Sequence, residues 1–134
     1  AGPRLVEIGT APLQTDVTGV GPQVLGELLS CTQDQLLLSV EWATAETPSQ
    51  DLSVFVHALS RDNPTPIAQA DVFAPVYGWR PLTTWQANER VPDVYVLEVP
   101  PAQVDRVRYG MYRVTDTGFE NILERELTVE CNES

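Results

Sequence analysis

Apolar and polar residues alternate with a period of two along several short stretches of the chain, which is the pattern of half-buried β-strands. The clearest stretch is LLLSVEW at 36–42, where every second residue is apolar and is expected to face a core. The stretch DLSVFVHAL at 51–59 has the same period. One face of this second strand carries Leu52, Val54, Val56 and Ala58, and the other carries Ser53, Phe55, His57 and Leu59.

Turn-forming residues separate further strands. The turn RDNPTP leads into PIAQADVF, so residues 51–73 are predicted to form a hairpin. QVLGELLSC, at 23–31, is expected to be a strand with Val24 and Leu28 facing inward. VPDVYVLEVPP is a strand that two prolines end. A final hairpin is predicted from RVRYGMYRVTD, a turn at DTGFEN, and ILERELTVEC.

No helical stripe of apolar residues persists for more than about two turns. Eleven prolines and eight glycines also disfavour long helices. Seven to eight short strands joined by turns therefore predict an all-β protein, an antiparallel β-sandwich of the immunoglobulin-like or jelly-roll-like kind. We expect a partly irregular lead-in segment at 1–22 and a single sandwich domain at 23–134.

The last strand has two different faces. Leu123, Leu127, Val129 and Cys131 share one face with Arg125. Ile122, Glu124, Glu126, Thr128 and Glu130 share the other. A row of acids along one face is typical of a solvated face or a guarded sheet edge. The paired carboxylates of a glycosidase would instead converge on a cleft.

The chain is strongly acidic, with a formal net charge of −11 at pH 7. Such a surface repels phosphate backbones and anionic lipids. Nucleic acid and anionic membrane surfaces are therefore not expected as partners, and the simplest role of the charge is to keep the domain soluble.

Two cysteines, Cys31 and Cys131, lie near the two ends of the expected domain. They belong to no CxxC or Cys/His cluster, so no zinc site is predicted. One bridge would close a loop of roughly a hundred residues, worth about 4.7 kcal/mol in the chain-entropy model. We predict this disulfide, and with it an oxidising compartment; the alternative is two unrelated buried thiols.

No stretch is long and apolar enough to cross a bilayer, so the domain itself is not expected to be membrane-embedded. The first residues, AGPRLVEIG, lack the basic-then-apolar pattern of an export signal. If the domain is exported, its targeting segment is expected outside this chain.

Five segments occur in a familiar order: LLLSVEW, DLSVFVHAL, IAQAD, TTWQANERVPDVYVLEVP and RVRYGMYRVTDTGFENIL. Over roughly residues 23–130 they resemble an extracytoplasmic β-sandwich domain at the C-terminal end of some bacterial multi-pass membrane glycosyltransferases. Those enzymes are related to the dolichyl-phosphate-mannose protein mannosyltransferases. The matching positions are Trp42, Val54 to His57, Gln69, Asp71, Trp85, Glu89, Val91, Asp93, Tyr95, Gly110 and Tyr112.

Asn88 departs from this pattern, because glycine is usual there. Asparagine also tolerates left-handed turn geometry, so the departure is mild. The family's transferase chemistry lies in a membrane-embedded part that this chain lacks. The resemblance therefore implies an appended non-catalytic module, tethered to a membrane-spanning region outside this chain, or a free-standing relative of such a module.

His57 is the only histidine and the first candidate for catalysis. A general base needs a reachable nucleophile and an orienting partner, and no elbow such as GxSxG supplies the nucleophile. A buried imidazole satisfied by a backbone or carboxylate group explains the residue equally well. We predict a structural His57, alongside Trp42, Trp85 and Tyr95 as packing residues, and no catalytic site.

The segment PVYGWRPLTTW, residues 75–85 and called the aromatic loop below, is the candidate binding site. Tyr77 and Trp79 are candidate stacking rings for sugar faces, and Arg80 is a planar donor for a hydroxyl or a carboxylate. The expected ligand is a glycan or an acidic partner segment. The alternative is that these rings cap the open end of the core.

Calcium is a candidate metal, because it binds oxygen ligands. Candidate carboxylate ligands are Asp62, Asp93 and Asp116. Their spacing is unlike that of an EF-hand, and we expect turn and strand-end residues that bond local amides instead. No metal or cofactor is predicted.

The sequence thus predicts a non-catalytic module on the cell surface or periplasmic side, associated with a membrane glycosyltransferase. Its partner would be a glycan or a cell-envelope protein. The alternatives are a purely structural spacer or stabilising domain and a free-standing secreted binding protein.

Overall fold

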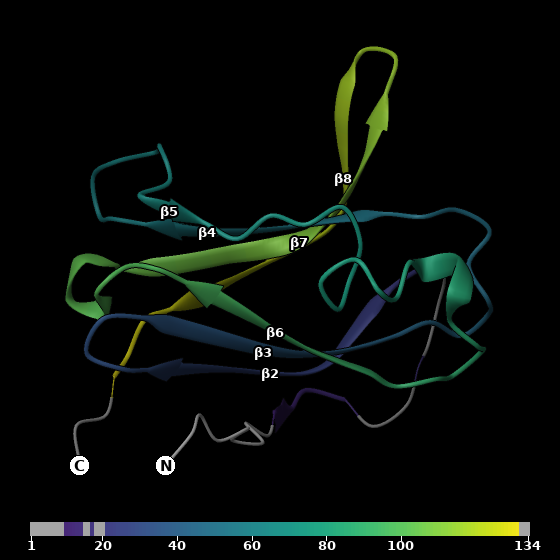
Figure 1. The fold of residues 1–134 in the computed structure, drawn as a ribbon, viewed down its shortest axis with the longest axis horizontal. Coiled ribbons are helices and arrows are strands. Elements are labelled where there is room, and N and C mark those ends of the chain that lie inside the picture. Colours follow the sequence, from purple (N-terminus) through teal and green to yellow (C-terminus); the bar gives the residue numbers. More distant parts are fainter. Residues whose placement is uncertain (1–9, 15–16, 18–20, 132–134) are drawn as a thin grey trace.

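Eight antiparallel strands form two sheets that pack face to face in the computed structural model (Figure 1). The structure describes residues 10–14, 17 and 21–131, so most of the expected lead-in segment lies outside the described residues. The strands are β1 (Ala11–Pro12), β2 (Gln23–Cys31), β3 (Leu36–Ala43), β4 (Ser53–Leu59), β5 (Ala68–Gln69), β6 (Val91–Leu97), β7 (Arg106–Thr115) and β8 (Gly118–Thr128). The predicted all-β sandwich is confirmed.

The strand order resolves the choice between the two predicted topologies. The first sheet runs β1-β2-β3-β6 and the second runs β5-β4-β7-β8. The chain thus crosses between the sheets after β3, returns to pair β6 with β3, and crosses again to place β7 beside β4. This is the order of an immunoglobulin-type sandwich, whose second sheet is extended at one edge by a short strand.

The core lies between the sheets, where the alternating residues of β3 and β4 meet. Leu36, Leu38, Val40 and Trp42 are fully buried, as the period-two pattern predicts. The indole of Trp42 packs edge-on against the ring of Tyr109 on β7, with their centroids 5.9 Å apart. This contact joins the two sheets at the centre of the sandwich.

Strand β2 corrects one prediction, because Leu28 is exposed and Glu27 is buried. The pairing register of β2 with β3 shifts between Val24 and Gly26, which marks a β-bulge. A bulge adds one residue to one strand, so every later side chain changes face. Val24 faces inward as expected, whereas beyond the bulge Glu27 takes the inward position.

Glu27 is compensated from the opposite sheet. The hydroxyl of Tyr109 donates to Glu27 Oε1 at 3.1 Å, and Arg125 of β8 forms an ion pair with the same oxygen. Burial would lower the pKa of Arg125, but the hydrogen bond and charge of Glu27 outweigh it and raise that pKa above its usual value. Burial and the nearby Glu27 also raise the pKa of Tyr109 well above the usual range.

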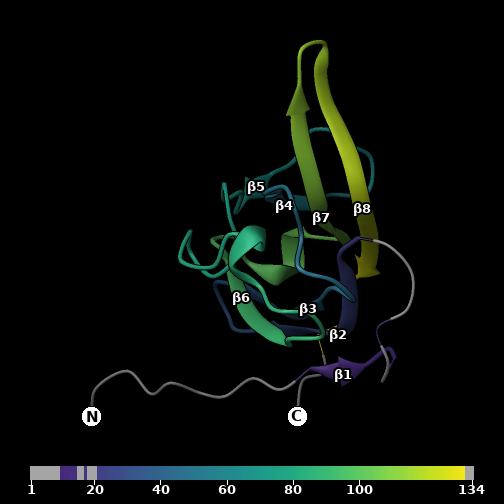
Figure 2. The ribbon, with the colours of Figure 1, turned by 90° about the vertical axis from the view of Figure 1, so that its right-hand side faces the viewer.

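Strands β7 and β8 form a long hairpin whose far end projects beyond the sandwich (Figures 1 and 2). The turn is tighter than predicted: it occupies Asp116 and Thr117, and Gly118 has a φ of 137°. Residues 119–121 therefore belong to β8 rather than to the turn. The predicted acidic face of β8 is confirmed as exposed, and Glu124 and Glu126 pair with Arg108 and Arg106.

Gly110 allows β8 to approach β7 closely. A Cβ at this position would lie 1.8 Å from the carbonyl oxygen of Leu123, so β8 must move away. Because β8 is an edge strand and can shift, we expect Gly110→Ala to destabilise the fold by about 1–3 kcal/mol in urea unfolding. Val114→Ala, at an exposed site on the same hairpin, should stay within about 0.5 kcal/mol of the parent. Equal stability of the two variants would contradict this account of Gly110.

The predicted disulfide between Cys31 and Cys131 is present, with the two Cα atoms 5.8 Å apart. Cys31 ends β2 in the first sheet, and Cys131 follows β8 in the second. The bridge therefore ties the two sheets together at one end of the sandwich.

The short strand β1 falls within the expected lead-in segment. Ala11 and Pro12 pair with Glu27 and Gly26, so this part of the segment joins the edge of the first sheet. Among the residues that the structure describes, no helix has the length and apolar character needed to span a membrane.

Candidate functional site

The aromatic loop closes one side of the sandwich, between the edges of the two sheets. Just before it, Val72 exchanges backbone hydrogen bonds with Val54 of β4. The loop then reaches the opposite sheet, where the amide of Val76 donates to the carboxylate of Asp93 on β6 at 2.8 Å. The chain is thus fixed to the second sheet just before the loop and to the first sheet within it, which limits how the loop can move.

The backbone of the loop holds an uncommon conformation. Val76, Tyr77 and Gly78 have φ values of 55°, 54° and 87°. A positive φ costs little for glycine but is unfavourable for a β-branched residue such as valine. Such strain persists only where surrounding contacts enforce it, and it is found preferentially at functional sites.

Asp93 is the contact that enforces this conformation. It lies in the middle of β6, is buried, and accepts hydrogen bonds from the amides of Val76 and Val94 and from the hydroxyl of Tyr95. Burial raises the pKa of Asp93 even though these donors favour its charged form. Asp93 is therefore not a strand-end residue: it bonds the local amide of Val94, as expected, and also the distant amide of Val76. Asp62 and Asp116 do lie in turns.

The two predicted stacking rings both point into solvent. Tyr77 is 66% exposed and Trp79 is 81% exposed, so neither ring caps the core. Trp42, Trp85 and Tyr95 are buried among the core residues. Trp79 is therefore the exposed one of the three tryptophans.

Arg80 braces the loop rather than facing outward as an unpaired donor. Its Nη2 donates to Glu89 Oε1 at 2.7 Å, and its Nε donates to the hydroxyl of Thr84 at 3.3 Å. The hydrogen bond from Arg80 and the amide of Gln86 hold the pKa of Glu89 below its usual value. The carbonyl of Arg80 accepts the indole N–H of Trp85, so one residue connects the exposed loop to a buried ring. Close by, Asn88 has a φ of 63°, a left-handed geometry that asparagine tolerates.

A third exposed ring, Phe73, was missed by the sequence analysis. It is 75% exposed, and its ring lies against Gly78, where an added Cβ would come within 2.7 Å. Phe73 directly precedes the loop, and its place in the return strand PIAQADVF indicates packing. In the sequence, the signal that could have found Phe73 is Gly78, between Tyr77 and Trp79, because a glycine leaves room for a neighbouring ring.

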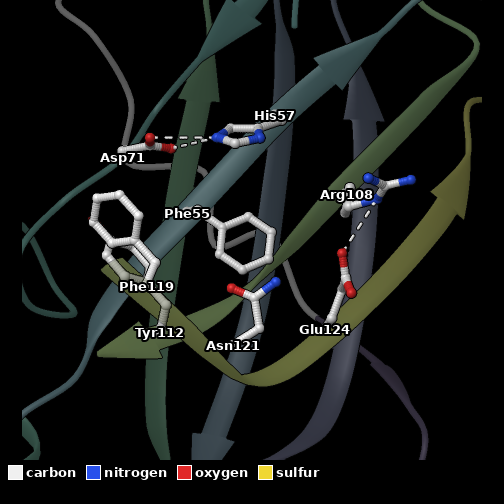
Figure 3. Close-up of a pocket in the computed structure, with 8 residues that line it drawn as sticks. All are labelled: Phe55, His57, Asp71, Arg108, Tyr112, Phe119, Asn121 and Glu124. Atoms are coloured by element: carbon white, nitrogen blue, oxygen red, sulfur yellow. Dashed lines mark hydrogen bonds and ion pairs between the residues drawn. The ribbon is translucent and has the colours of Figure 1, made fainter. Parts of the chain in front are cut away.

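His57 is not buried, which corrects the expectation for this residue. It lies on the outer face of the second sheet, and its side chain is 27% exposed. Its Nε2 lies 3.3 Å from both carboxylate oxygens of Asp71, which also accepts the amide of Val56 (Figure 3). The imidazole therefore has a carboxylate partner but also faces solvent.

Comparisons with protein-family models, with curated proteins and with solved structures found no match. The resemblance to a glycosyltransferase-associated domain therefore stays a prediction, and the site must be judged by its geometry.

Proposed function

We propose that this chain is a non-catalytic recognition module that binds carbohydrate through the aromatic loop. The observation behind this proposal is the set of three exposed rings, Phe73, Tyr77 and Trp79, on one backbone segment held in a strained conformation. Flat rings that are already held in solvent contact a ligand at a small cost in conformational entropy. Sugar rings present apolar faces that stack on such side chains.

A glycan fits this loop better than an acidic protein segment. Arg80 is the cation nearest to the rings in sequence, and its charge is matched by Glu89. The chain as a whole carries a net charge of −11, which repels anionic partners. A neutral or weakly charged ligand does not need an unpaired cation in the loop and is not repelled by the net negative charge.

The disulfide supports a location outside the cytoplasm, because small domains keep such bridges in oxidising compartments. The module would then lie on the cell surface or periplasmic side, appended to or associated with a membrane glycosyltransferase. In that setting it brings a glycan, or a glycosylated partner in the cell envelope, close to the transferase without performing chemistry.

Replacing both predicted rings, as Tyr77→Ala/Trp79→Ala, should remove glycan binding and leave the fold intact, because the rings contact solvent rather than the core. Binding to a neutral glycan array is measured first, and hits are titrated by calorimetry. We expect parent affinities on the order of 0.1 to 1 mM, since a few contacts must offset the lost freedom of the ligand. In the parent, bound glycan should also shield Trp79 from acrylamide quenching.

The matched control is Leu28→Ala, which removes an exposed apolar side chain from the first sheet. It should bind glycan like the parent. If the double variant instead loses stability and binding is unchanged, the loop is a packing element and a structural spacer is the better description.

A further inference from the structure

A concave site, separate from the aromatic loop, lies on the outer face of the second sheet. It is a hollow of about 310 Å³ in which Phe55 is surrounded by side chains from β4, β7, β8 and the segment after β5 (Figure 3). A pocket of this size is at the small end of the range for organic ligands. Its lining residues are Phe55, His57, Asp71, Arg108, Tyr112, Phe119, Asn121 and Glu124.

The hollow follows from the register of the sheet. Phe55 of β4 pairs with Gly110 of β7, which pairs in turn with Glu124 of β8. Gly110 has no side chain, and β8 lies close against this position, so Phe55 and Glu124 line the hollow from β4 and β8. A bulge at Met111 and Tyr112 then bends the hairpin, which agrees with its departure from the sandwich in Figure 2.

Aromatic rings form one wall of the hollow. The ring of Tyr112 lies 6.3 Å from that of Phe55 and meets Phe119 edge-on at 5.4 Å. Phe119 is 74% exposed, although it stands beside two other rings. The ring of Phe119 thus leaves an apolar surface exposed to solvent on the β7–β8 hairpin.

Polar groups form the rest of the rim, and they are paired with one another. His57 is held by Asp71, and Arg108 Nε lies 3.4 Å from Glu124 Oε1. Asn121 adds an amide that both donates and accepts (Figure 3). The rim therefore offers several fixed donors and acceptors beside an apolar wall and carries no uncompensated positive charge for an anion.

We propose that this hollow is a saccharide subsite that takes one residue of a neutral glycan. A sugar ring places an apolar face and several hydroxyls side by side, which matches an aromatic wall next to paired donors and acceptors. A wholly apolar ligand would remove water from the paired carboxylates, imidazole and guanidinium without replacing its hydrogen bonds, at a cost in desolvation. An anionic ligand would meet Asp71 and Glu124 on a chain of net charge −11.

A short segment of chain connects the hollow to the aromatic loop. Asp71 is on the rim, and Phe73, two residues later, begins the row of exposed rings. The hydroxyl of Ser53 donates to the carbonyl of Phe73, and Ser53 pairs with Tyr112 of the aromatic wall. The ligand is then an oligosaccharide that spans both, an extension that rests on the proposed function of the loop.

The experiment compares neutral oligosaccharides of one to six residues, built from mannose, glucose or galactose, by calorimetry and by saturation-transfer NMR. Phe119→Ser and Asn121→Ala test the hollow, because both side chains are exposed and their loss should spare the fold. Tyr77→Ala/Trp79→Ala tests the loop, and Leu28→Ala is the control on the first sheet. Thermal unfolding verifies that each variant is folded.

We expect affinity to rise with chain length. Phe119→Ser should weaken binding by about twofold to tenfold, the value of one aromatic contact, and Asn121→Ala should weaken it by a similar factor through the loss of a hydrogen bond. Binding that depends on the loop but not on Phe119 or Asn121 overturns the subsite and leaves the proposed function standing. If Phe119→Ser and Asn121→Ala weaken binding but Tyr77→Ala/Trp79→Ala does not, the subsite stands and the proposed role of the loop is wrong. No binding to any member of the series overturns both.

Discussion

Removing the disulfide, as Cys31→Ala/Cys131→Ala, should lower the free energy of unfolding by about 2–5 kcal/mol. The bridge closes a loop with a sequence separation of 100, and it joins the end of β2 in one sheet to Cys131, shortly after the end of β8 in the other. Without it, the unfolded chain gains the conformations that loop closure excludes. Guanidinium unfolding of the parent and the variant measures the difference.

Reductant supplies the control for this experiment. Dithiothreitol should lower the unfolding midpoint of the parent towards that of the variant, while leaving the variant itself unchanged. A parent whose midpoint is unaffected by reductant, or whose unfolded form has two reactive thiols before reduction, would contradict the bridge.

Replacing Arg125 with methionine should destabilise the fold by about 3–5 kcal/mol, because it leaves the carboxylate of Glu27 buried without its counter-charge. Glu27 is 5% exposed, and the hydroxyl of Tyr109 is then its remaining partner across the sheets. Methionine keeps most of the length and apolar contact of the arginine stem, so the loss reports mainly on charge. Urea unfolding at neutral pH is the measurement.

Two further variants separate charge from packing. Arg113→Met breaks an exposed pair with Glu120 on the same hairpin and should cost less than about 1 kcal/mol. The double variant Glu27→Leu/Arg125→Met removes the buried carboxylate together with its partly exposed partner and should recover most of the stability. A double variant as unstable as Arg125→Met alone would show that the arginine acts through packing.

The period-two pattern was sufficient to predict the two-sheet architecture, because a strand buried on one face must alternate. The run from Leu36 to Trp42 is fully buried at every second position. Leu123 and Leu127 of β8 are likewise half-buried, between exposed acids. The disulfide was also predictable, since two isolated cysteines at opposite ends of one small domain have few other roles.

Local backbone irregularities reversed other predictions. The bulge in β2 places Glu27 inward and Leu28 outward. Gly26 in QVLGELLSC is compatible with a bulge but does not by itself specify one. The compensating Arg125 lies far along the chain, so the buried pair exists only once the two sheets are stacked. Asp93 is similar, because its partner at Val76 belongs to a loop that the fold brings against β6.

The sequence by itself therefore determined the fold class, the bridge and the segment that carries Tyr77 and Trp79, because each depends on residues close in sequence or on composition. The tertiary structure alone decided that these rings face solvent and that Phe73 joins them. It also decided that His57 meets Asp71 beside an open hollow. That hollow depends on cross-strand register, which is a property of paired strands rather than of any one of them.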